Sequence, residues 1–152
     1  MMIVPREILV PTDFSDTSKA ALSWAAGLGH SCNASLHLLH VLDTLTVADP
    51  VDVPFEARTR IEKAIEASAW DDLRSLLPVE DQERLRITLA VEWGTPLTEI
   101  VRYASSHQIG LIAMGTHGHG HKHHVLLGSV ATHVVSRAPC TVLVVRSSNH
   151  DH

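Results

Sequence analysis

The chain has 152 residues, 45% of them hydrophobic, which is the length and composition of a single globular domain with its own core. A formal net charge of −5 and an aromatic content of 4% argue against nucleic-acid binding, which depends on basic patches and stacking side chains. No apolar run is long enough to span a membrane, and the N-terminus lacks the basic-then-apolar order of a signal peptide, so we expect a cytoplasmic protein with no membrane partner.

Short apolar runs alternate with amphipathic stretches along the chain, a pattern that predicts alternating strands and helices. Gly27 and Gly29 are expected to end the first helix, whereas Thr95 with Pro96 is expected to begin the third. The segment over residues 43–55 is rich in proline and aspartate and is predicted to be an exposed loop. In chain order, the predicted elements are a strand over residues 6–12, a helix over 15–29, a strand over 35–42, a helix over 56–77, a strand over 84–92, a helix over 95–107, a strand over 109–114, a helix over 128–138 and a strand over 141–145.

This alternation predicts an α/β fold, in which right-handed crossovers build a parallel sheet with helices on both faces. The apolar stripe that each helix should bury includes Trp24 in the first helix and Ile61 in the longest one. We expect a single-domain, open, doubly wound, five-stranded parallel sheet over residues 1–147, followed by a short C-terminal tail over 148–152. If the chain runs outward through strands 1, 2 and 3 and returns to the other side of strand 1, the strand order is 3-2-1-4-5.

The predicted order places a ligand site between strands 1 and 4, because open α/β sheets bind ligands at the carboxyl ends of the strands where the strand order reverses. Pro11, Thr12 and Asp13 end the first strand, and Met114 and Gly115 end the fourth. The carboxylate of Asp13 suits a ribose hydroxyl or a metal ion. Equally, Asp13 or the nearby Ser15 could cap the first helix, and the sequence leaves both roles open for Asp13.

A glycine pattern follows the fourth strand. Gly115, Gly118, Gly128 and Ser129 have the spacing GxxG, nine residues, G[ST]. Glycines let backbone amides approach phosphate oxygens, a following helix adds its N-terminal amides, and Ser129 adds a hydroxyl. The pattern is neither a Walker loop nor a dinucleotide GxGxxG fingerprint. Glycines that merely serve turns are the alternative, but four spaced positions between a strand and a helix favour phosphate binding.

The same segment is rich in histidine. His117, His119, His121 and His123 alternate along it and are candidate metal ligands, since imidazole is the commonest metal-binding side chain. The alternative, which we favour, is a solvated loop whose partly protonated imidazoles attract phosphates, because no acidic residue or cysteine completes a ligand set within the loop. The histidines of the regular elements are interpreted as packed or surface residues; they are His37, His40 and His133.

The chain resembles the universal stress protein family over essentially its full length. The glycine and serine spacing matches the motif of that family's ATP-binding branch, whereas Arg, Gly, Leu and Ser are often found where this chain carries His119 to His124. The resemblance implies a UspA-like, Rossmann-like fold of the adenine nucleotide alpha hydrolase-like type. The blocks that carry it are ILVPTDFSDTSKAAL, LLHVLD, EWGTPLTEIVRYA, LIAMGTHGHG and LLGSVATHVVSRAPCTVLVV.

The resemblance also implies a ligand, a site and an assembly. The implied ligand is ATP, or AMP or ADP, accompanied by Mg²⁺, and the resemblance would place Asp13 near the ribose and the backbone around Val41 near the adenine. A homodimer joined through residues 141–145 is implied as well, and the sequence adds its own reason, because an apolar edge strand without guarding charges needs a partner. The implied nucleotide-binding residues are Pro11, Thr12, Asp13, Val41, Met114, Gly115, Gly118, His119, Gly128, Ser129 and Val130.

Three functions follow as hypotheses. The leading one is a nucleotide-dependent stress-response or regulatory dimer. The second is at most a weak ATPase, for which His117 or His119 is the nearest candidate base, although the chain has no recognisable catalytic motif. The third is a metal-binding protein that uses its histidine-rich loop.

Overall fold

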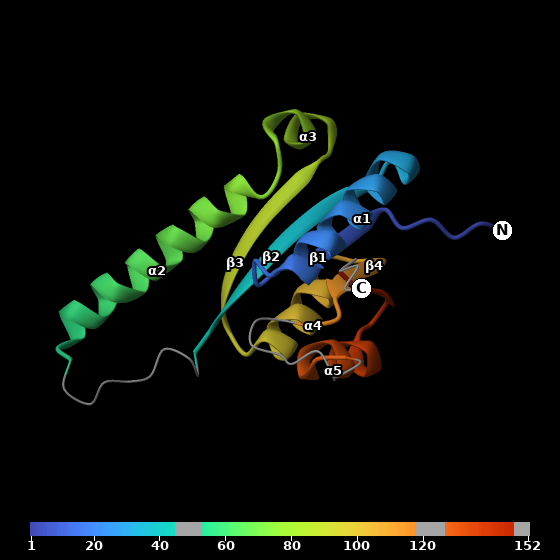
Figure 1. The fold of residues 1–152 in the computed structure, drawn as a ribbon. Coiled ribbons are helices and arrows are strands. Elements are labelled where there is room, and N and C mark those ends of the chain that lie inside the picture. The colour runs from blue at the N-terminus through green and yellow to red at the C-terminus, as the bar shows by residue number, and fades with distance from the viewer. Residues whose placement is uncertain (45–52, 118–126, 148–152) are drawn as a thin grey trace, which may run out of the picture.

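The computed structural model describes residues 1–44, 53–117 and 127–147, and its helices and strands alternate along nearly the whole chain (Figure 1). Within these residues no helix is long and apolar enough to cross a membrane. The elements are β1 (Glu7–Pro11), α1 (Asp16–Cys32), β2 (Ser35–Asp43), α2 (Phe55–Ser75), α3 (Val79–Arg84), β3 (Ile87–Gly94), α4 (Pro96–Ser106), β4 (Leu111–Gly115), α5 (Ser129–Arg137) and β5 (Thr141–Val145).

The five strands form one all-parallel sheet in the order β3-β2-β1-β4-β5, which confirms the predicted topology. The central strand β1 pairs with β2 on one side and with β4 on the other. At the carboxyl edge, Pro11 of β1 is in register with Leu39 of β2, and Gly115 of β4 is in register with Val145 of β5. The strand order therefore reverses between β1 and β4, as expected.

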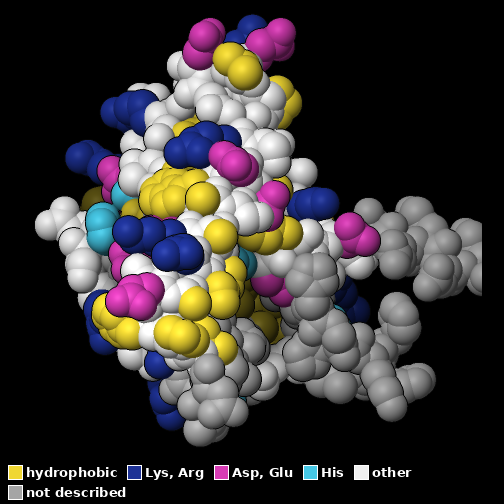
Figure 2. Space-filling model, turned by 90° about the vertical axis from the view of Figure 1, so that its left-hand side faces the viewer, with side chains coloured by type: hydrophobic (Ala, Val, Ile, Leu, Met, Phe, Trp, Pro, Cys, Tyr) yellow, Lys and Arg dark blue, Asp and Glu magenta, His cyan; other side chains and the backbone are white. Residues whose placement is uncertain are grey.

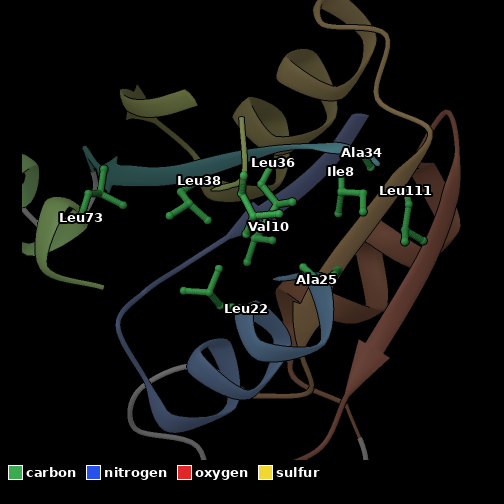
Figure 3. Close-up of a cluster of buried hydrophobic side chains, with 11 residues drawn as sticks. Ile8, Val10, Leu22, Ala25, Ala34, Leu36, Leu38, Leu73 and Leu111 are labelled. Atoms are coloured by element: carbon green, nitrogen blue, oxygen red, sulfur yellow. The ribbon is translucent and has the colours of Figure 1, made fainter. Parts of the chain in front are cut away.

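Two hydrophobic cores lie on the two faces of this sheet, because successive strand residues point to opposite faces. Figure 3 shows the first core, which includes Ile8 and Val10 of β1, Leu22 and Ala25 of α1 and, farther along the sheet, Leu73 of α2. The second core packs α4 and α5 against the other face. Its fully or almost fully buried members include Leu9, Leu39, Ile100, Ile112 and Val134. The sheet thus has helices on both faces, and its central strand is buried from Ile8 to Pro11.

Helix α1 extends past the two glycines that were predicted to end it. It runs to Cys32, and Asn33 closes it in the left-handed conformation at φ 55°. Gly29 is buried, and a Cβ added there would lie 2.6 Å from a methyl carbon of Leu36. The glycine lets the helix pack closely against β2, a tertiary requirement that a local pattern does not reveal.

The start of the predicted third strand is also wrong, because a short helix, α3, occupies Val79–Arg84 and β3 begins only at Ile87. Pro78 precedes this helix, and acidic side chains in its first turn favour the positive end of the helix dipole. Leu85 follows α3 and is buried in the first core. Its apolar side chain made the segment look like part of a strand.

The predicted apolar stripes of α1 and α2 are buried only in part. Trp24 on α1 is 61% exposed, and Ile61 on α2 is 48% exposed, whereas Ala69 and Leu73 farther along α2 are buried. The N-terminal half of α2 extends beyond the sheet (Figure 1), and on that side of the molecule hydrophobic side chains lie among charged ones (Figure 2). The 3.6-residue period therefore identified the helices correctly but overstated how much of them is covered.

A chain of polar contacts, centred on the buried His37 and Tyr103, joins β1, β2 and α4 near the amino ends of the strands. Nδ1 of His37 lies 2.8 Å from the hydroxyl oxygen of Tyr103, and its Nε2 lies 2.8 Å from a carboxylate oxygen of Glu7. The ring of His107 stacks on Tyr103 with 3.7 Å between the ring centroids. His37 is thus a packed histidine, as expected, and both its ring nitrogens have partners within the fold.

The buried Tyr103 gives a testable titration. Burial, and then the negative charges of Glu92 and Glu7, raise the pKa of Tyr103 from 10.0 to about 12. Because the folded pKa exceeds the unfolded one, this group's stabilising contribution is complete below pH 10 and is lost as the pH rises toward 12. Tyr103 is the only tyrosine of the chain, so the tyrosinate absorbance should report it alone, with ionisation near pH 12. Ionisation near pH 10 with an unchanged circular dichroism spectrum would contradict this burial.

Candidate functional site

A cavity of about 520 Å³ opens at the carboxyl ends of the central strands. The ends of β1, β2 and β4 and the beginnings of α4 and α5 surround it. The predicted site residues that line it are Pro11, Thr12, Asp13, Val41, Met114, Gly115, Gly128, Ser129 and Val130. Two other predicted residues, Gly118 and His119, lie outside the described residues. The topology has thus brought together side chains from both ends of the chain.

The turn between β1 and α1 forms one wall of the cavity and is held by hydrogen bonds to the central strands. The backbone N–H of Thr12 donates to the carbonyl of Leu39 at 2.8 Å, and its hydroxyl lies 3.1 Å from that of Ser18. The backbone N–H of Phe14 donates to the Thr12 hydroxyl oxygen at 3.0 Å. Thr12 is itself buried, so the turn starts from a fixed point on the sheet.

Asp13 has features of both roles that its sequence position left open, which are capping the first helix and contacting a ligand. Ser15 is the N-cap of α1, with its side chain accepting from the backbone N–H of Ser18. A carboxylate oxygen of Asp13 accepts from the backbone N–H of Ser15 at 3.0 Å, which orders the turn just before the helix. Asp13 also lines the cavity. Its carboxylate therefore has its orientation set by the turn while it borders the site.

At the opposite wall, Gly115 is required by the close approach of α1. A Cβ added at Gly115 would lie 2.5 Å from the hydroxyl oxygen of Thr17 and 2.7 Å from the Thr17 carbonyl carbon. The hydroxyl of Thr17 donates to the carbonyl of His117, which ties the segment after β4 to the first turn of α1. Packing alone thus accounts for the first glycine of the pattern, independently of any ligand.

Gly128 and Ser129 bring the start of α5 to the same place. The backbone N–H of Gly128 donates to the carbonyl of Thr116 at 2.6 Å, and the N–H of Thr116 donates to the carbonyl of Val145 at 3.0 Å. Gly128 is the N-cap of α5, and Ser129 is its first residue. The N-terminus of α5, with the partial positive charge of its first backbone amides, therefore borders the cavity beside Gly115.

Several cavity residues were not identified from the sequence. His40 was interpreted as a packed or surface residue, yet it lines the cavity, as do Asp43 and Ile100. The strand period predicts only which face of the sheet a side chain points to, and at a strand's carboxyl end residues from both faces can border a cavity. The signal that could have identified His40 is its position next to Val41, near the carboxyl end of β2.

The predicted metal ligands are only partly described. His117 lines the cavity, and its Nδ1 lies 3.0 Å from the hydroxyl oxygen of Thr116, while His119, His121 and His123 lie outside the described residues. Across residues 1–44, 53–117 and 127–147, no group of three or more His, Cys, Asp or Glu side chains has an arrangement that could hold a metal ion. His133 is exposed on α5, as expected.

The cavity combines three kinds of surface. Leu39, Ile100 and Met114 provide apolar side chains, Asp13 provides a carboxylate, and the start of α5 provides backbone amides. Such a mixture suits a ligand with a flat apolar part, a hydroxyl group and an anionic group. A cavity of this kind at the switch point of a five-stranded parallel sheet is typical of Rossmann-like α/β proteins.

The chain belongs to the Universal stress protein family, whose match covers residues 5–146. Universal stress protein MJ0531 of Methanocaldococcus jannaschii is 33% identical to it, in an alignment that covers 93% of this chain and 82% of the relative. Universal stress protein A homolog 1 of Coxiella burnetii is 32% identical, over 92% of this chain and 95% of the relative.

Solved structures of this family share the fold. Universal stress protein UspA from Lactobacillus plantarum has a TM-score of 0.81 at 30% identity, over 95% of this chain and all of that one. The structure of MJ0577, which is named a universal stress protein of Methanocaldococcus jannaschii, has a TM-score of 0.84 at 27% identity, over 97% of this chain and 99% of that one. The predicted family and its UspA-like relationship are therefore confirmed.

The packing role of Gly115 can be tested without any ligand. We expect Gly115→Ala to lower the free energy of unfolding by about 1–3 kcal/mol, because the added methyl group has no room beside the Thr17 backbone. Denaturant unfolding followed by circular dichroism would measure it. The matched control is Gly27→Ala in α1, where an added Cβ meets nothing within 4 Å and should raise the stability by about 0.5–1 kcal/mol. A Gly115→Ala variant as stable as the natural chain would contradict the packing account.

Proposed function

We propose that this protein binds ATP, or the related AMP or ADP, in the carboxyl-end cavity and acts as a nucleotide-dependent regulator in a stress response. The observation that carries the proposal is the convergence of Asp13, Gly115, Gly128 and Ser129 on one cavity of about 520 Å³. The sequence predicts these residues as nucleotide ligands, because a carboxylate suits a ribose hydroxyl and glycine amides with a serine hydroxyl suit phosphates. They come from three separate segments of the chain, so local sequence does not explain why they meet.

Each part of an adenine nucleotide has a counterpart in the cavity. Leu39, Ile100 and Met114 offer apolar contacts for the base, and the backbone around Val41 offers hydrogen-bonding groups for its edge. The carboxylate of Asp13 would accept from a ribose hydroxyl, an interaction for which its orientation is already set.

The phosphates would lie at the start of α5. There the hydroxyl of Ser129 and the first backbone amides of the helix would donate to phosphate oxygens. Gly128 also lines the cavity, and it has no side chain that would keep a phosphate away from its backbone. Mg²⁺ would accompany the phosphates and neutralise part of their charge.

Two proteins with the same fold support the choice of ligand. One universal stress protein, with a TM-score of 0.69 at 22% identity, was solved in complex with cAMP. Another, from Archaeoglobus fulgidus, with a TM-score of 0.59 at 21% identity, was solved in complex with dAMP. At these identities the likeness is one of fold, so the assignment to this chain rests on its own cavity.

We propose in addition that the working form is a homodimer joined through β5. This strand lies at one end of the sheet and is paired on one side, with β4, among the described residues. Its sequence, TVLVV, is apolar and carries no charge that would guard an edge. A second copy of β5 would pair its open side.

Nucleotide binding can be tested at Ser129. Calorimetric titration of the natural chain with ATP and Mg²⁺ should saturate near one ATP per chain. Ser129→Ala should weaken the affinity about five- to tenfold, because it removes one hydrogen bond to a charged phosphate. The matched control is Ser136→Ala, an exposed serine of the same helix whose hydroxyl donates to the carbonyl of Thr132 at 3.2 Å.

The control variant should bind ATP as the natural chain does. No saturable binding of ATP, ADP or AMP to the natural chain, checked by a second method such as fluorescence of a nucleotide analogue, would overturn the proposal. Equal affinities for Ser129→Ala and the natural chain would remove Ser129 from the site.

A further inference from the structure

Phe14, directly after Asp13, has a backbone conformation that aromatic residues rarely adopt. Its φ is 65°, in the left-handed region that glycine enters without cost. A bulky side chain is strained in this conformation and persists there only where its surroundings hold it. Because Asp13 and Phe14 are consecutive, whatever holds Phe14 also fixes the direction in which the Asp13 carboxylate leaves the chain.

His40 contacts this turn in two ways. Its Nδ1 lies 2.7 Å from the carbonyl oxygen of Thr12, and its ring lies against that of Phe14 with 4.6 Å between the centroids and 39° between the planes. The turn from Thr12 to Phe14 is therefore held at both ends by one imidazole that belongs to another strand. Thr12, Asp13 and His40 all line the cavity.

The geometry also defines the tautomer of this imidazole. A carbonyl oxygen accepts and does not donate, so Nδ1 of His40 carries a proton and donates to Thr12.

We propose that His40 is a positioning residue that holds Asp13 ready for a ribose hydroxyl. It acts through two contacts, the hydrogen bond to the Thr12 carbonyl and the ring contact with Phe14, and itself need not touch the ligand. The inference rests on the proposed adenine nucleotide function and extends it, since it assigns the recognition of the ribose to a pair of residues, Asp13 and His40.

The test compares ATP with 2′-deoxyATP and 3′-deoxyATP, which lack one ribose hydroxyl each. One of the two analogues lacks the hydroxyl that donates to Asp13. The natural chain should bind that analogue about tenfold more weakly than ATP, because one hydrogen bond to a charged group is lost. His40→Phe keeps an aromatic ring against Phe14 but removes the donor to Thr12. It should bring the affinities for ATP and for that deoxy analogue within about twofold of each other, mainly because ATP binds more weakly to the variant.

Two further variants make the comparison specific. His40→Asn places an amide donor where Nδ1 was and should restore most of the preference for ATP. His107→Phe is the matched control, because the Nδ1 of His107 also lies near a backbone carbonyl, that of Tyr103 at 3.0 Å, and its ring also packs on an aromatic one, outside the cavity. It should leave both affinities unchanged. If His40→Phe does not fold by circular dichroism, His40→Leu serves as the donor-free variant.

The outcomes separate this inference from the proposed function. A natural chain that does not bind ATP overturns the proposed function and the inference with it. If the natural chain binds ATP but treats both deoxy analogues like ATP, or if the donor-free variants keep the full preference, the inference fails while nucleotide binding stands. A role of His40 in folding alone would weaken ATP and its analogues by the same factor and would also overturn the inference.

Discussion

The close approach of α1 to the end of β4 sets the geometry of the carboxyl-end site. Helix α1 lies so close to Gly115 that a Cβ there would overlap the Thr17 backbone. The Thr17 hydroxyl donates to the carbonyl of His117. Because the first turn of α1 lies here, the loop that precedes it, with Asp13, must face the segment that leaves β4. The same contact holds that segment in the place where Gly128 can bond to Thr116 and start α5. The close contact that Gly115 permits thus sets how the two walls of the cavity lie relative to each other.

A histidine of β2 has a different role at each end of the sheet. At the amino ends, His37 uses both ring nitrogens within the fold, on Glu7 and Tyr103, so this polar chain joins three elements and serves their packing. At the carboxyl ends, His40 supports a turn that borders an open cavity. The difference follows from the parallel sheet, in which loops and helix N-termini gather at the carboxyl edge.

The topology and much of the cavity could be predicted from the sequence, because they depend on rules that act over short segments. Alternating strands and helices lead to the order 3-2-1-4-5, and that order places Asp13 beside Gly115 without any knowledge of side-chain contacts. The family resemblance added residues such as Val41 and Val130, which carry no chemical signal of their own.

What the sequence did not reveal depends on tertiary contacts. Gly29 looked like a helix end, and only its distance to Leu36 explains why a glycine lies within α1. Leu85 looked like a strand residue because it is apolar, and only the structure shows that it follows a short helix and is buried in the first core. His40 looked like a packing residue, since its link to Thr12 crosses between two strands that are 28 residues apart at this point. Such features need the relative placement of elements, which local periodicity does not carry.

We propose above all that a nucleotide binds in the carboxyl-end cavity. The most direct measurement is a titration of the ¹⁵N-labelled protein with ATP and Mg²⁺, followed through the backbone amide resonances. We expect saturable shifts to concentrate on the turn after β1, the end of β2, the end of β4 and the first turn of α5, while the amide resonances around Glu7, His37 and His107 do not shift. Shifts centred on the amino-end residues or on the outer side of α2, or none at all, would contradict it.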